Sequence, residues 1–207
     1  MIDYKEYTLP NGLTILANYD ECSMMAAVNL LYKVGSRDEE PSRTGFAHLF
    51  EHLMFRGTKN IPDFDLPVEE VCGENNAFTS ADYTNHHITT PKENFETALW
   101  LEADRMMGLD ITPEKLAIEK SVVIEEFNQR FLNRPYGEQW HRLREMVYTA
   151  HPYRWPVIGL TPDHIRSASL EDVRAFYERY YNPSNAILSI SAGLPAEQIF
   201  EAAERYF

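Results

Sequence analysis

The sequence has few cysteines, few basic residues and no long apolar run. Its two cysteines, Cys22 and Cys72, form no C-x-x-C pair in 207 residues, which argues against a disulfide framework or a cysteine-rich zinc site. Lysine and arginine number 19 against 32 acidic residues, for a formal net charge of −13. That balance argues against nucleic acid or an anionic membrane as a partner, because both require basic surface.

Segments that direct or anchor a chain are also lacking. No run reaches the roughly 20 apolar residues of a membrane-spanning helix, and the N-terminus has neither the basic head nor the apolar segment of a secretory signal. We therefore expect a cytoplasmic protein, although the sequence leaves open a removed targeting segment. With 44% hydrophobic residues, the chain is long enough to bury a core as one large domain or two small ones. Four aromatic residues are expected to pack in that core: Trp140, Tyr148, Tyr153 and Trp155.

Turn and capping signals predict hairpins and helices in mixed order, without regular β-α-β alternation. Asn11-Gly12 predicts a hairpin turn, and Thr112-Pro113-Glu114 predicts a helix start. The predicted strands are 7–9, 13–17, 26–34, 75–80, 84–90 and 186–191. The predicted helices are 44–56, 64–71, 91–107, 112–131, 136–148, 169–181 and 196–207. This order favours an α+β fold, mainly an antiparallel sheet packed with helices.

One five-residue segment, His48-Leu49-Phe50-Glu51-His52, carries most of the functional information. Histidines four apart on a helix project from one face and can bind one metal ion. Glu51 lies on the flank of that pair, where a carboxylate can take a proton from a water bound to the metal. A random shuffle of this composition would contain roughly 0.04 such matches. H-x-x-E-H is the inverzincin signature, the reverse of the H-E-x-x-H metalloprotease motif.

Two histidines leave a hydrolytic zinc site incomplete, because such a site has three protein ligands and an open position. The helix predicted after Thr112 offers Glu119 and Glu126, which are seven residues apart and share a face within about 20°. One of these carboxylates could bind zinc while the other supports the site from one turn away. The spacing alone does not choose between them. His86 and His87 are adjacent on a predicted strand and point to opposite faces, so we expect ordinary strand residues there.

Taken together, the two motifs resemble the pitrilysin family of zinc peptidases (M16-type inverzincins), which includes insulin-degrading enzyme and the mitochondrial processing peptidase. His48-x-x-Glu51-His52 is followed along the chain by the segment from Glu119 to Glu126. The resemblance extends in order over essentially the whole chain. Other matching segments are Pro10–Leu13, Gly35–Glu39, Gly45–His48, Asn76–Ser80, His151–Tyr153 and Tyr180–Asn185.

The resemblance implies a zinc metalloendopeptidase that hydrolyses peptide bonds of extended peptides or small proteins. It implies one Zn²⁺ per chain, bound by His48, His52 and Glu126, with Glu51 as the general base and Glu119 as a supporting carboxylate. It also implies a strand that binds the peptide substrate through Asn76, Ala77, Phe78 and Thr79. Residues 1–207 would form a single zinc-binding domain, with a second homologous domain or subunit, or a homo-oligomer, as the partner.

Two alternatives remain open at this point. The chain could be a non-catalytic or partner-dependent assembly subunit of a peptidase complex. It could also resemble S-ribosylhomocysteine lyase, which has an H-x-x-E-H site with a cysteine as third ligand. Cys72 is the only cysteine downstream of the motif. The helix with Glu119 and Glu126 goes against the lyase.

Overall fold

The fold is built on one mixed sheet, and a computed structural model describes it for residues 2–207. Those residues contain six strands: β1 (Lys5–Thr8), β2 (Thr14–Tyr19), β3 (Met25–Tyr32), β4 (Glu74–Thr79), β5 (Thr84–Pro91) and β6 (Ala186–Ala192). The strand order is β1-β2-β6-β3-β5-β4. Only the β2–β6 pair is parallel. The α+β class with a mainly antiparallel sheet is therefore confirmed.

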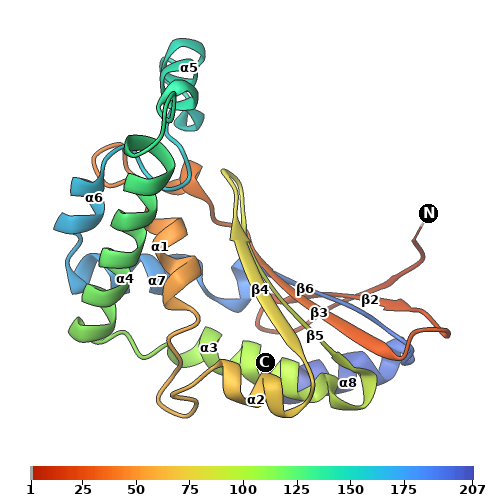
Figure 1. The fold of residues 1–207 in the computed structure, drawn as a ribbon. Helices are drawn as coiled ribbons and strands as arrows, with labels where there is room; N and C mark the ends of the chain where they lie inside the picture. The colour runs from red at the N-terminus through yellow and green to blue at the C-terminus, as the bar shows by residue number, and fades with distance from the viewer. Residues whose placement is uncertain (1) are drawn as a thin grey trace.

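Helices cover one face of the sheet and extend beyond its β4 end (Figure 1). Those of the described residues are α1 (Phe46–Leu53), α2 (Asp65–Glu70), α3 (Phe95–Gly108), α4 (Pro113–Phe127), α5 (Gln139–Val147), α6 (Pro162–Ser167), α7 (Leu170–Tyr180) and α8 (Ala196–Tyr206). α3 contacts β3 and β5, and α8 contacts β2, so these two helices form the layer beneath the sheet. None of the described helices combines the length and apolar character that crossing a membrane requires.

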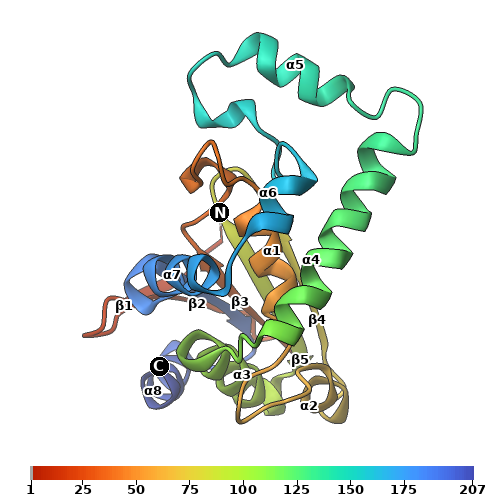
Figure 2. The same ribbon diagram turned by 90° about the vertical axis from the view of Figure 1, so that its left-hand side faces the viewer.

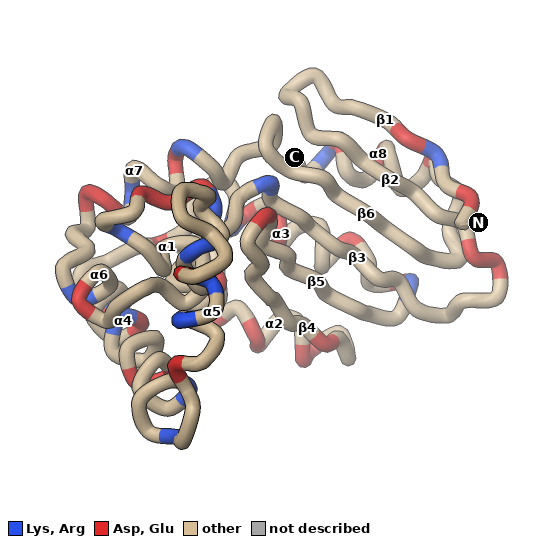
Figure 3. The backbone as a smooth tube through the Cα atoms, turned by 90° about the horizontal axis from the view of Figure 1, so that it is seen from above, with Lys and Arg blue, Asp and Glu red and all other residues tan. Residues whose placement is uncertain are grey.

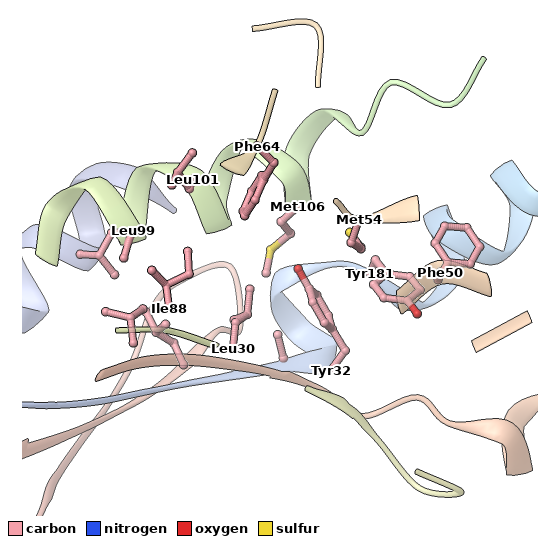
Figure 4. Close-up of a cluster of buried hydrophobic side chains, with 14 of the residues drawn as sticks. Leu30, Tyr32, Phe50, Met54, Phe64, Ile88, Leu99, Leu101, Met106 and Tyr181 are labelled. Atoms are coloured by element: carbon pink, nitrogen blue, oxygen red, sulfur yellow. The ribbon is translucent and has the colours of Figure 1, made fainter. Parts of the chain in front are cut away.

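Alternation along the strands explains why only one face is covered. Every second residue of β3 is buried, ending with Leu30 and Tyr32, and β6 alternates in the same way. Figure 4 shows these side chains against Leu99 and Met106 of α3. Side chains of a strand alternate between faces, so the other residues line an open face. β2, β3, β5 and β6 contain no Asp, Glu, Lys or Arg. Charge gathers on helices, loops, β1 and the start of β4 (Figure 3).

Most predicted elements are present, with differences at their ends. The last turn of the 112–131 helix is a π-helix from Asn128 to Leu132. β5 runs through Pro91, so α3 starts only at Phe95, after a 3-10 turn. α6 was not predicted, although Thr161 caps it and Pro162 opens it. Both are ordinary start signals.

The segment around α5 stands away from the rest of the molecule (Figure 2). α5 lies in this segment and has no buried residue. Trp140 is 57% exposed, so its prediction as a core residue is wrong, whereas Trp155 is buried and donates to the carbonyl oxygen of Ser36 over 2.6 Å. Trp155 packs inside because its N–H finds a backbone acceptor there.

Candidate metal centre

The helix that carries the motif begins at a position where only glycine fits. Gly45 has φ 95°, in the left-handed region, and a Cβ there would lie 2.7 Å from the carbonyl oxygen of Ile158. Glu39 then accepts the N–H groups of Gly45 (2.8 Å) and Ala47 (2.9 Å). Burial raises the pKa of Glu39 to about 8, against the lowering effect of these backbone N–H groups. The carboxyl group thus occupies amides that the first turn of α1 leaves without partners.

The second helix of the site is positioned by its cap and its buried stripe. Thr112 accepts the N–H of Lys115, and Pro113 is the first helical residue, as the sequence predicted. The residues of α4 that are buried lie on one face: Leu116, Glu119, Val123 and Phe127. This face packs against α1. Glu126, seven residues after Glu119, therefore points toward the same neighbour.

Three ligand atoms converge between α1 and α4. His48 Nε2 lies 3.0 Å from Glu126 Oε2, and His52 Nε2 lies 3.4 Å from the same oxygen. Tetrahedral zinc with bonds of about 2.0–2.1 Å separates its ligand atoms by roughly 3.3 Å, so these spacings suit one zinc ion. Within residues 2–207, this is the one set of three His, Cys, Asp or Glu side chains whose ligand atoms lie within 4.8 Å of one another.

The fourth and fifth predicted side chains lie beside this trio. Glu51 Oε2 is 3.5 Å from His48 Nδ1, and its side chain is 20% exposed. Glu119 Oε2 is 3.4 Å from His52 Nδ1, and its side chain is buried. The structure thus brings the five predicted side chains of the centre together. The roles of these five residues as metal ligands, general base and supporting carboxylate stay predictions.

The two histidines have opposite electrostatic surroundings. Burial lowers the pKa of His48 to about 4, with a further lowering by His52, so the His48 ring is neutral at neutral pH. Burial also opposes charge on His52, but hydrogen bonds with Glu119 and Glu126 outweigh it and raise the pKa to about 9. The two carboxylates therefore make a position that favours positive charge.

Both carboxylates are held ionised by their neighbours. The hydrogen bond with His52 is the largest effect that lowers the pKa of Glu126. Burial raises the pKa of Glu119, but hydrogen bonds with His52 and Arg56 leave it below its ordinary value. An ionised carboxylate is the form that binds a metal ion.

Two arginines at this centre were missed by the sequence reasoning. Arg56 donates to Glu119, and Arg130 Nη2 lies 2.5 Å from Glu126 Oε1. Each arginine follows a site residue by four positions, His52 and Glu126 respectively. That spacing places side chains on one face of a helix and was the available signal, although α1 ends at Leu53 and Arg56 lies just beyond it. The arginines hold the outward oxygens of the two carboxylates and leave the inward oxygens toward the histidines.

The four residues predicted to bind substrate lie on β4, at the edge of the sheet. β4 pairs only with β5 among the described residues. Ala77 and Thr79 share the covered face, because they pair with His86 and Thr84, both buried. Asn76 and Phe78 point to the open face, where Phe78 is 46% exposed.

The fold and the convergent trio together define a class: an inverzincin-type metal-binding domain. Comparison with known proteins then identifies the family. Residues 14–150 match the model described as "Insulinase (Peptidase family M16)", and residues 167–207 match the model described as "Peptidase M16 inactive domain". The chain belongs to peptidase family M16, in agreement with the resemblance seen in the sequence.

The curated relatives agree with this assignment and are about twice as long as this chain. The chain is 35% identical over 207 residues to "Zinc protease PqqE" of Helicobacter pylori. The matched region spans 99% of this chain and 46% of that protein. A crystal structure of a protease from Helicobacter pylori, also 35% identical, superposes with a TM-score of 0.95 over 100% of this chain and 50% of that one. Pitrilysin, at 20% identity, shares the fold with a TM-score of 0.85 and is covered over 22% of its length. The chain thus spans about half the length of the curated relatives it matches.

Proposed function

We propose that this chain is the zinc-binding domain of a metalloendopeptidase that hydrolyses extended peptides or small proteins. Residues 1–207 form a single domain in this proposal. The observation that carries it is the convergence of His48 Nε2, His52 Nε2 and Glu126 Oε2 with the Glu51 carboxylate beside them. Membership of family M16 and the 35% identity to a protein named as a zinc protease support it.

In this proposal, His48, His52 and Glu126 would hold one zinc ion per chain. His52 would lose its proton when zinc binds. With two neutral imidazoles and one carboxylate as ligands, the zinc-loaded centre would keep a net positive charge, which would polarise the scissile carbonyl and lower the pKa of water. Glu51 accepts the proton of the attacking water and delivers it to the leaving amine. Glu119 acts on His52: by accepting from Nδ1, it would leave Nε2 as the nitrogen that offers its lone pair to zinc.

The substrate peptide binds as an added strand on β4. An extended peptide can pair with the free edge of a sheet, with backbone hydrogen bonds supplying affinity. β4 has such an edge among the described residues, and α1 with Glu51 packs against it. The N–H of Ala77 is bonded by the Asn76 side chain at 2.8 Å. A peptide that takes this N–H displaces the Asn76 side chain.

A second domain completes the peptidase. The support is length: the chain covers 46% of its relative and 50% of the chain in the solved structure. The partner is a second homologous domain or subunit, or another copy of this chain. A lyase-like site receives no support, because Cys72 is not among the convergent ligands.

The test is cleavage of a pool of unstructured peptides by the zinc-loaded chain and by Glu51→Gln. We expect Glu51→Gln to retain one zinc per chain and to lose cleavage by about 10²–10⁴-fold, the usual contribution of a general base. Glu125→Gln is the control, since Glu125 lies on α4 beside the site residue Glu126 but outside the convergent group. Cleavage by Glu51→Gln at the wild-type rate would contradict the mechanism. Zinc without cleavage in the wild type would favour the partner-dependent subunit.

A further inference from the structure

Thr79, the last residue of β4, contacts Glu51. Its hydroxyl donates to Glu51 Oε2 over 2.6 Å. The direction of this side chain follows from register, because Thr79 pairs with Thr84, which is buried on the covered face. Thr79 therefore points toward α1 and away from the free edge, while its backbone remains part of the edge strand.

This hydrogen bond makes the surroundings of the two Glu51 carboxylate oxygens different. Oε2 receives the Thr79 hydroxyl and lies 3.5 Å from His48 Nδ1. Oε1 has no hydrogen-bond partner among the side chains and backbone of residues 2–207. One oxygen of the carboxylate is thus anchored and the other is free to accept a proton.

The anchor itself is rigid. Threonine is β-branched and has restricted χ1 freedom in a strand. The turn after β4 is closed by the Ser80 N–H on the Tyr83 carbonyl (2.8 Å). The Ser80 hydroxyl also accepts the N–H groups of Asp82 (3.1 Å) and Tyr83 (3.0 Å). The end of β4 therefore has little freedom to carry Thr79 away from α1.

We propose that Thr79 is a positioning residue that orients Glu51, so that its free oxygen faces the attacking water. The inference rests on the proposed function of Glu51 as the general base. It also gives β4 two tasks: its edge pairs with the peptide, and its last side chain aligns the base. A misplacement of about 1 Å in a reacting group can cost a hundredfold in rate.

The first experiment compares kcat and KM of Thr79→Val and Thr79→Ser with the wild type, in the zinc-loaded protein. Valine keeps the branched shape without the hydroxyl, so we expect kcat to fall by about 10–100-fold with KM within about twofold. Serine restores the hydroxyl and returns kcat to within about threefold of the wild type. Zinc content stays at one per chain. Thr90→Val is the matched control, because Thr90 is buried on the neighbouring strand with an unpartnered hydroxyl.

Three outcomes are distinct. Unchanged kcat in Thr79→Val overturns the inference, as does an equal loss in the valine and serine variants. Wild-type activity in Glu51→Gln overturns the proposed function instead.

A second measurement does not depend on activity. The thermal midpoint is recorded for Thr79→Val, Glu51→Ala and the double variant. A hydroxyl bonded to a carboxylate predicts that Thr79→Val lowers Tm by about 4 °C in the wild type and by less than 1 °C in the Glu51→Ala background. Equal shifts in both backgrounds overturn the inference even where no peptide is cleaved.

Discussion

His48 and His52 lie four residues apart on α1, whereas His86 and His87 are neighbours on β5. The helical spacing directs both rings of the first pair to one side, where the carboxylates of α4 meet them. The strand spacing sends the second pair to opposite faces of the sheet. Only one ring of the second pair reaches the covered face.

That ring, His86, is buried among other rings. Its centroid is 6.0 Å from those of Tyr32 and Phe55, and neither ring nitrogen has a hydrogen-bond partner among residues 2–207. Glu102, a buried acid of α3, is bonded instead by Arg105. Within the described part of the chain, no carboxylate forms a hydrogen bond with His86.

The difference appears in the pKa values. Burial lowers the pKa of His86 well below its ordinary value, with further lowering by Arg105 and His87. Burial acts on His52 in the same direction, yet its two carboxylate partners raise its pKa to about 9. A pair of histidines is thus not enough to mark a metal site in this fold; the acids on the facing helix distinguish one pair from the other.

The largest expected difference between the two pairs is in zinc affinity. His52→Ala removes a converging ligand and should weaken zinc binding at least a hundredfold, beyond the 10–100-fold typical of outer partners. His86→Phe should leave the affinity within about twofold, since His86 is no part of the trio. Competition with a chromogenic chelator measures both. Loss of zinc binding in His86→Phe would contradict the claim that only the His48–His52 pair binds zinc.

A smaller effect is expected when a supporting acid is neutralised. Glu119→Gln keeps the shape but weakens the bond to His52 Nδ1, so zinc affinity should fall by about 10–100-fold. Glu125→Gln on the same helix should leave it unchanged. The same chelator titration applies to both variants. Equal affinities in the two variants would mean that Glu119 only fills space.

The smallest effect concerns stability against pH. His86 has an unfolded pKa of about 6.5 and a lower folded pKa, so the unfolded chain binds the proton first as pH falls. Its contribution to stability is complete above pH 6.5 and is lost below it, at up to about 1.4 kcal/mol per pH unit. His86→Phe should remove this part of the slope in urea unfolding between pH 7.5 and 5. An unchanged slope would show that His86 does not stay neutral.

Much of the fold could be predicted because its signals are local. The Asn11-Gly12 turn, the Thr112-Pro113 helix start and the H-x-x-E-H spacing each lie within a few residues. Contacts between distant segments were beyond such reasoning. The bond from Thr79 to Glu51 crosses 28 positions of sequence and depends on where β4 lies against α1.

The errors have a related cause. Trp140 was assigned to the core because large aromatic residues usually pack there. Composition says nothing of whether a helix meets another layer, and α5 meets none that buries it. A related limit concerns the third zinc ligand: the choice of Glu126 over Glu119 came from the family resemblance and not from the spacing. Their shared helix face does not distinguish them.

The most direct test of the zinc site is X-ray absorption at the zinc edge of the loaded chain, beside Glu126→Gln. The account predicts two imidazole ligands with nitrogen and oxygen at about 2.0–2.2 Å and no sulfur at about 2.3 Å, with weakened binding in Glu126→Gln. A sulfur ligand, a single imidazole, or an unchanged zinc environment and affinity in Glu126→Gln would contradict it.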